Sequence, residues 1–299
     1  MICRSHLGRL IQHHNHHHAL KSCTSNTYYD SQSGQHVPIH NENEVSVYLR
    51  GIGGCSTQKV IDAAKQYGCS GSILQDWMNS DDNIVNDIPS ISSTDNIYVH
   101  IKPELYLIKH PLEEQPFSKR SYNPCLEYKI SNEDDIISII KHVASDIQQD
   151  VSIGIFDSNI IMNEDPISVS ASIANIIDCT SVSDENENET APYISNILIA
   201  PPSDTNDNTP TIDCNADNLI RLCEELSYLD VPGPTIKSRL IVSTLNNNED
   251  VIEECLQIGI NKYILDISDD NDMNDLDDRL RGLKDIVEEE GKELILTDV

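Results

Sequence analysis

Short runs of apolar residues recur from residue 45 to the end of the chain and predict buried β-strands. Because the runs are apolar at consecutive positions, they are typical of parallel strands covered on both faces, which helical crossovers connect. Eight runs have the length and the Ile, Val and Leu content of such strands: residues 45–49, 72–75, 97–108, 151–156, 194–200, 239–245, 262–267 and 293–297.

Between these strands, apolar residues recur at helical spacing and predict helices over residues 57–67, 133–148, 167–177, 216–228, 249–257 and 275–290. Ser131, Asn215 and Asn248 precede three of them and are residue types that cap a helix N-terminus. The polar, proline-containing stretch 112–131 is interpreted as a loop. Two acidic, asparagine-rich stretches, residues 184–190 and 203–213, are interpreted as insertions.

Strands and helices therefore alternate, which predicts an α/β protein with a mostly parallel sheet. Eight strands over about 255 residues match the size of a TIM (β/α)8-like barrel. An open doubly wound parallel sheet gives the same alternation and is the alternative. We expect one barrel-like domain over residues 41–299, preceded by a targeting or disordered leader over residues 1–40.

The chain is strongly acidic, with a formal net charge of −30. Arg4, Arg9 and Lys21 are the only charged side chains of residues 1–29, so the remainder carries about −33, from −30 minus +3. Such a body repels phosphate backbones and anionic membranes. No apolar run approaches the roughly 20 residues of a membrane-spanning helix. We therefore expect no nucleic-acid binding and no membrane span.

The first 29 residues are basic, free of acids and contain serines and scattered apolar residues, as mitochondrial transit peptides do. They lack the continuous apolar core of a secretory signal. We predict a mitochondrial location, with the cytoplasm as the alternative. The histidine-rich run at residues 13–18 contains potential ligands for Zn²⁺, Ni²⁺ or Cu²⁺, and we interpret it as low-complexity sequence within the leader.

No motif in the body predicts a metal site. The nine cysteines occur singly without a C-x-x-C pair, which indicates free thiols in a reducing compartment. The acidic cluster at residues 269–278 lacks the glycine of an EF-hand loop and suits the N-terminus of the helix that follows. The run Gly51-Ile52-Gly53-Gly54 lacks the third glycine of a dinucleotide-binding fingerprint, and we interpret it as a tight turn rather than a phosphate cradle.

Several segments resemble the aldo-keto reductases, in compatible order. Residues 104–111, ELYLIKHP, resemble the family's DLYLIHxP strand. Residues 47–51 with 57–63 resemble its first strand and helix, residues 152–155 resemble its xYGIS strand, and residues 236–238 resemble its IPKS cofactor-binding turn.

The resemblance implies a TIM barrel that binds NADP and reduces the carbonyl group of a small-molecule substrate. It implies a catalytic tetrad of Asp, Tyr, Lys and His, in which Tyr donates the proton. Lys102 and His110 would be the catalytic lysine and histidine of this chain. Lys237, Ser238 and Arg239 would bind the cofactor.

Other family positions carry different residues here. Gln75 and Ser80 align with the catalytic Asp and Tyr, so that no proton donor is evident, a loss that costs orders of magnitude in rate. Two hypotheses follow: an NADP-dependent oxidoreductase of aldo-keto reductase type, or a catalytically inactive barrel that binds a partner protein or a small ligand. A lyase or isomerase that uses Lys102 or Lys262 as a Schiff-base amine is a third hypothesis.

Overall fold

The structure is a computed structural model, and it divides the chain into two compact units, Met1–Glu42 and Asn43–Val299. It describes residues 27–30, 35–38, 43–52, 55–74, 97–101, 122–147, 151–180, 194–201, 216–231, 235–245, 247–267 and 273–296. In the first unit, β1 (Thr27–Asp30) and β2 (Gln35–Pro38) pair antiparallel. The targeting role of residues 1–40 stays a prediction.

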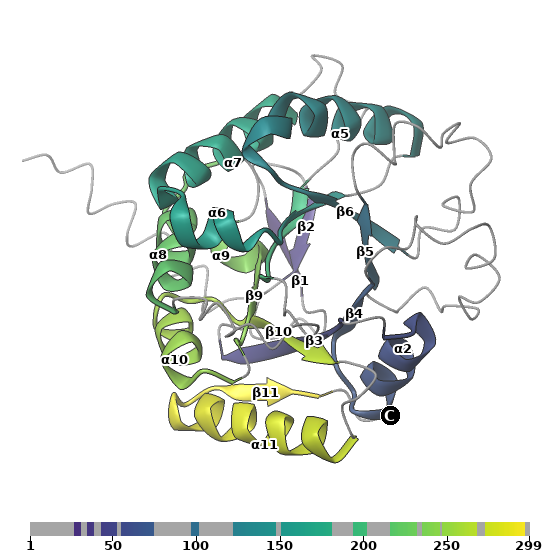
Figure 1. The fold of residues 1–299 in the computed structure, drawn as a ribbon, viewed down its shortest axis with the longest axis vertical. Coiled ribbons are helices and arrows are strands. Elements are labelled where there is room, and N and C mark those ends of the chain that lie inside the picture. The colour runs from purple at the N-terminus through teal and green to yellow at the C-terminus, as the bar shows by residue number, and fades with distance from the viewer. Residues whose placement is uncertain are drawn as a thin grey trace, which may run out of the picture. The chain divides into compact units, whose positions relative to one another are not determined.

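The second unit is built on a curled sheet in which all strands are parallel (Figure 1). Consecutive strands from β3 to β10 pair with each other, and β10 also pairs with β3 over six residue pairs, from Lys262 with Ser46 to Ile267 with Gly51. The strands are β3 (Glu44–Gly51), β4 (Gly71–Leu74), β5 (Ile97–Ile101), β6 (Tyr122–Glu127), β7 (Val151–Ile155), β8 (Ile194–Ile199), β9 (Leu240–Ser243), β10 (Lys262–Ile267) and β11 (Glu293–Ile295), the last of which pairs with the start of β3.

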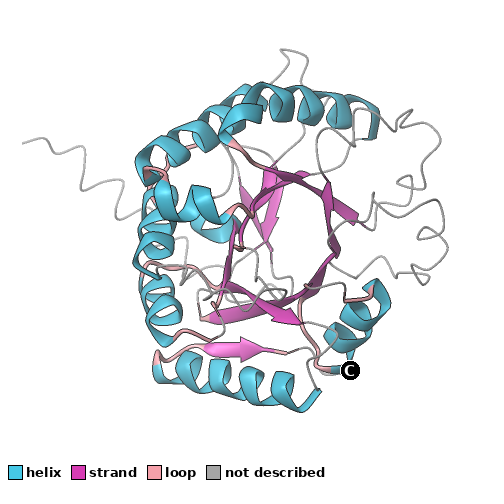
Figure 2. Cartoon of the chain, viewed as in Figure 1, coloured by secondary structure: helices cyan, strands magenta, loops and turns pink. Residues whose placement is uncertain are grey.

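The longer helices lie on the outer side of this sheet, and short helices lie in the connections (Figure 2). They are α2 (Thr57–Gln66), the 3-10 turn η3 (Ile130–Asn132), α5 (Glu133–Ile147), α6 (Ser158–Asn163), α7 (Pro166–Thr180), α8 (Ala216–Ser227), α9 (Ile236–Arg239), α10 (Glu249–Gln257) and α11 (Met273–Glu289). None of the helices among the described residues is long and apolar enough to cross a membrane. The predicted α/β class with a parallel sheet is confirmed.

Side-chain alternation divides the core into an outer and an inner layer. On β3, Val45, Val47 and Leu49 pack with the helices in the larger cluster, whereas Tyr48 belongs to a smaller cluster of residues in the strands or directly after them. That inner cluster contains Tyr48, Ile73, Cys125, Phe156, Leu198, Ala200, Ile241 and Ile264. The consecutive apolar positions noted in the sequence thus reflect strands that are covered on both faces.

Glycines permit two close approaches in this packing. A Cβ atom on Gly51 would lie 2.7 Å from Cγ2 of Val60, so glycine lets α2 approach the end of β3. A Cβ atom on Gly154 would lie 2.2 Å from the ring of Phe156, which folds back over β7. Helix packing therefore accounts for the first glycine of the Gly51–Gly54 run without a phosphate.

One prediction was wrong: the stretch 112–131 is not a loop throughout, because it contains β6. Pro124 lies within β6, in register with Val99 of β5, and proline in a strand lowers its apparent strand propensity. Cys125 and Leu126 are fully buried on opposite sides of the strand, and this tertiary packing outweighs the local signal. The strand predicted at residues 293–297 is confirmed over Glu293–Ile295 as β11, which pairs with the start of β3.

Candidate functional site

The carboxyl ends of β3, β8 and β10 carry a buried polar network on the inner side of the sheet. Arg50 lies two residues after Tyr48, and Asp266 lies two residues after Ile264, so both side chains project to the same side as the inner apolar cluster. The two residues are also direct neighbours in the register of β3 and β10. Parallel strands bring their carboxyl ends to one edge, where α/β proteins commonly bind ligands.

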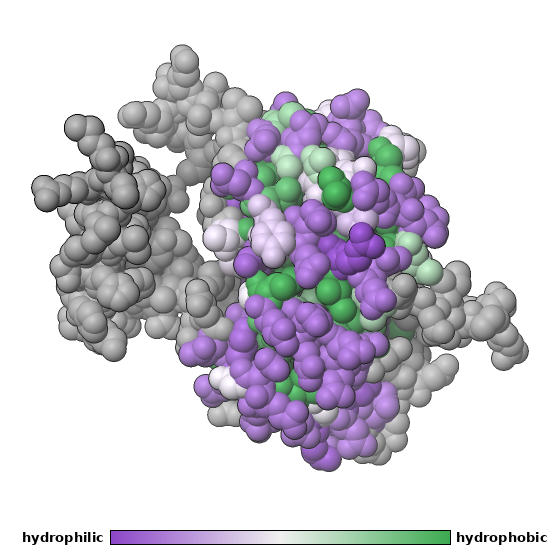
Figure 3. All heavy atoms as spheres, turned by 90° about the vertical axis from the view of Figure 1, so that its left-hand side faces the viewer, coloured by the Kyte–Doolittle hydropathy of each residue, from purple (hydrophilic) through white to green (hydrophobic). Residues whose placement is uncertain are grey.

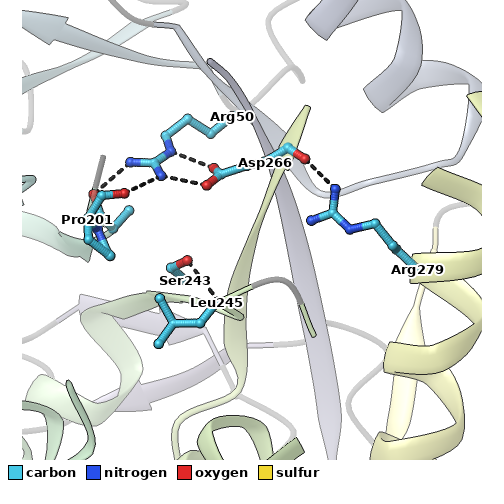
Figure 4. A network of polar contacts seen from close by, with 7 residues as sticks. Arg50, Pro201, Ser243, Leu245, Asp266 and Arg279 are labelled. Carbon is cyan, nitrogen blue, oxygen red and sulfur yellow. Dashed lines mark hydrogen bonds and ion pairs between the residues drawn. The ribbon is translucent and has the colours of Figure 1, made fainter. Parts of the chain in front are cut away.

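The guanidinium of Arg50 is engaged on three sides (Figure 4). Nε and Nη2 donate to Oδ1 and Oδ2 of Asp266 at 2.6 and 2.7 Å, a two-pronged ion pair. Nη1 donates to the carbonyl oxygen of Ala200 at 2.6 Å, and Nη2 also donates to that of Pro201 at 2.7 Å. The Arg50 side chain has no exposed surface, and that of Asp266 is 10% exposed. This arginine therefore ties the end of β3 to the ends of β8 and β10.

The loop after β9 lies beside this network and has unusual backbone geometry. Leu245 and Asn247 have φ angles of 47° and 60°, in the left-handed region that non-glycine residues seldom adopt. Two side chains stabilise the turn: the hydroxyl of Ser243 accepts from the amide of Leu245, and that of Thr244 accepts from the amide of Asn247. The side-chain oxygen of Asn248 accepts from the amide of Val251 and caps α10, as predicted.

On α11, Arg279 reaches the same end of β10. Its Nη1 donates to the backbone carbonyl of Asp266 at 2.6 Å and lies 4.0 Å from Oδ2 of Asp275. Figure 4 shows Arg279 on the opposite side of β10 from Arg50. Two arginines therefore contact Asp266 at the end of β10: Arg50 binds its carboxylate, and Arg279 binds its backbone carbonyl.

A second polar group lies at the amino ends of the strands. Nζ of Lys262, the first residue of β10, donates to the carbonyl of Ser238 at 2.6 Å and to Oδ1 of Asn196 at 3.4 Å. Burial lowers the pKa of Lys262 to about 8, because the charged form loses its hydration. A perturbed lysine is a candidate reactive group. Here the amine lies at the end of the sheet opposite to Arg50 and is bonded to the last turn of α9.

The predicted cofactor residues are close to Lys262. Lys237, Ser238 and Arg239 lie in α9, which directly precedes β9 and therefore lies at its amino end. The hydroxyl of Ser238 donates to the carbonyl of Thr235, Nζ of Lys237 lies 5.9 Å from the ring centroid of Tyr228, and Arg239 is 1% exposed. This arrangement does not fit a dinucleotide bound at the carboxyl ends. Cofactor binding stays a prediction for these residues.

The predicted catalytic residues Lys102 and His110 lie outside the described residues. The same holds for Gln75 and Ser80. Of the predicted cofactor residues, Ser238 contacts Lys262 through its backbone carbonyl, and the hydrogen bonds described above for Arg50 and Asp266 involve none of the three. Sequence reasoning overlooked Arg50 and Asp266, although a charged residue at the end of an apolar strand is itself a signal of a buried polar contact.

Among the described residues, no group of three or more His, Cys, Asp or Glu side chains could hold a metal ion. The described part of the acidic cluster is engaged with arginines, since Arg281 pairs with Asp277 and Asp278. The remaining acids of the cluster at residues 269–272 lie outside the described residues. Its described carboxylates therefore act as ion-pair partners on α11.

The chain matches no protein-family model, and no curated protein matches its sequence.

Proposed function

We propose that this chain is a (β/α)8 barrel that acts as a binding protein for a protein partner and does not transfer hydride. The barrel is supported by the pairing of each strand from β3 to β10 with the next and of β10 with β3. Helices follow six of these strands, namely β3, β6, β7, β8, β9 and β10. Residues 75–96 and 102–121, which follow β4 and β5, lie outside the described residues.

The single observation that carries the functional proposal is the state of Arg50. In a barrel enzyme, the carboxyl ends of the strands hold the reacting groups. Here the charged pair at that end is internally neutralised, and the guanidinium also binds two backbone carbonyls. A group bonded in this way stabilises the arrangement of the strands and has little capacity to bind substrate. Ser80 aligns with the catalytic Tyr of the aldo-keto reductases, and the lack of this proton donor also supports a protein that does not transfer hydride.

The charge of the outer surface supports a basic protein partner. Five acids gather where α10 and α11 pack together: Glu249, Asp250, Glu253, Glu289 and Glu290. Partial burial and the negative charge of the other four raise the pKa of Glu253. Figure 3 shows a mainly hydrophilic face on the side where α8 and α10 lie. A basic partner would relieve this repulsion and associate rapidly at low salt.

The first experiment separates binding from catalysis. The full chain is titrated with NADPH by calorimetry and assayed for reduction of a panel of aldehydes and ketones. We expect neither nucleotide binding nor turnover. Saturable NADPH binding with carbonyl reduction would refute the proposal.

The second experiment tests the partner. The chain is tagged in its source cells, and proteins that co-purify are compared for two variants of equal charge. Glu249→Gln/Asp250→Asn neutralises two exposed acids in the first turn of α10, and Asp134→Asn/Asp135→Asn neutralises two in the first turn of α5. We expect the first variant to lose a partner that the second retains. Identical recovery with both would contradict the assignment of the face.

An NADP-dependent oxidoreductase of aldo-keto reductase type is the second candidate. The segments that resemble the family's first strand and helix coincide with β3 and α2, and the xYGIS-like segment lies in β7, which is the observation in its favour. The same NADPH titration decides between the two candidates, because only the oxidoreductase requires the nucleotide.

A further inference from the structure

The guanidinium of Arg279 is buried, and only part of it is hydrogen-bonded. Its side chain is 15% exposed, and Nη1 donates to the carbonyl of Asp266. Nε and Nη2 are also inaccessible to solvent, and neither has a hydrogen-bond partner within the described residues. A buried charged donor without an acceptor is costly, because its hydration is lost and nothing replaces it. The two atoms therefore require an acceptor.

Arg50 shows what this edge of a guanidinium binds in the same protein. Its Nε and Nη2 hold the two carboxylate oxygens of Asp266 side by side. Nε–H and Nη2–H point in nearly parallel directions, so the edge matches two oxygens of one carboxylate or phosphate group. The corresponding edge of Arg279 has the geometry and the charge for the same type of ligand.

The loop after β9 contacts Arg279. Asn247, in the loop after β9, donates from Nδ2 to the backbone carbonyl of Arg279, so that this loop is fixed against α11. Oδ1 of Asn247 is a second buried polar atom without a partner in the described part of the chain. The loop also contains the left-handed residues Leu245 and Asn247, and such strained positions are enriched at ligand sites.

We propose that the Nε–Nη2 edge of Arg279 binds an oxyanion, a phosphate or carboxylate group of a small molecule, at the carboxyl ends of β9 and β10. The strong negative charge of the chain disfavours anions in general, so binding here would depend on the positive charge and the two unbonded donors of this guanidinium. The site uses residues other than the five acids of α10 and α11. It is compatible with either candidate function, so its failure leaves both unaffected.

The experiment measures the thermal midpoint of the full chain with increasing inorganic phosphate or sodium acetate, at ionic strength kept constant with KCl. Three variants are compared with the parent: Arg279→Lys keeps the charge and removes the two-donor edge, Arg279→Met removes both, and Arg281→Met is the matched control. Arg281 lies on the same helix with a side chain 68% exposed, and it pairs with Asp277 and Asp278.

We expect at least one of the two anions to raise the midpoint by several degrees, saturably, in the parent and in Arg281→Met. Both Arg279 variants should lose this increase. A response to phosphate alone identifies a phosphate group, and a response to acetate alone identifies a carboxylate. An equal response in all four proteins indicates general screening of the acidic surface and overturns the proposal, as does the absence of any response.

If Arg279→Met does not fold, Arg279→Lys and the ¹⁵Nε–¹H NMR signal of Arg279 in the parent still decide the matter. Anion binding should shift that signal downfield with the same saturation curve. An Arg279 signal that does not change over the titration would overturn the proposal.

Discussion

Replacement of Arg50 by methionine should strongly destabilise the second unit. Methionine has a similar length but donates no hydrogen bond, so the substitution leaves the Asp266 carboxylate and the carbonyls of Ala200 and Pro201 without the guanidinium. Removal of one partner from a buried ion pair costs about 3–5 kcal/mol. For a domain of this size, that loss lowers the thermal midpoint by roughly 6–20 °C.

The assay is urea denaturation followed by far-ultraviolet circular dichroism, on the parent, Arg50→Met, Asp266→Leu and the double variant. Because the pair is buried, the double variant should be less destabilised than the sum of the two single variants, by about 2 kcal/mol or more. A loss below about 1 kcal/mol for Arg50→Met, or strict additivity in the double variant, would show that the network does not stabilise the fold.

Three further perturbations test separate parts of the structure. Gly154→Ala should cost about 1–3 kcal/mol in the same urea assay, because the added methyl group overlaps the ring of Phe156. In the control Gly282→Ala on α11, the methyl group meets only a side-chain amide at 3.3 Å, so this variant should be neutral or slightly more stable. Lys262→Met should flatten the pH dependence of the free energy of unfolding, because burial lowers the pKa of Lys262 to about 8 in the folded chain and the amine therefore loses its proton at a lower pH than in the unfolded chain. Between pH 8 and 10.5 the parent should gain up to roughly 3 kcal/mol of stability relative to the variant. A constant difference in stability over this pH range would contradict the burial of the amine. Asn248→Ala should cost about 1 kcal/mol through the lost cap of α10, with Asn248→Asp as the conservative control, and equal stability of both variants would argue against the cap.

The sequence predicted most elements because local signals and tertiary packing agree in them. The strand at residues 262–267 and the helix at 249–257 have the observed bounds, the second because Asn248 fixes its start. Strand β6 was missed because Pro124 and its polar neighbours are typical of a loop. The strand is stabilised by the burial of Cys125 and Leu126 in the inner and outer layers of the core, which the local sequence does not indicate. The four-residue helix α9 was not predicted, and its last residue, Arg239, was taken as the first residue of the strand predicted at residues 239–245.

The candidate site was far less predictable than the fold. Arg50 and Asp266 are 216 residues apart, and only the register between β3 and β10 makes them neighbours. Nothing in the local pattern around either residue specifies that register. Lys237 and Arg239 were predicted to bind a cofactor from a family resemblance. The structure places them directly before β9, at its amino end, because this strand begins at Leu240.

The pairing of β10 with β3 makes completion of the fold a late event in the synthesis of the chain. At about 5–20 residues per second, a ribosome needs roughly 10–40 s to travel the 216 residues from Arg50 to Asp266. During that time one edge of β3 is open, with Arg50 deprived of its carboxylate, and an open strand edge favours association with other chains. We therefore expect products truncated before β10 to aggregate rather than persist as a smaller domain.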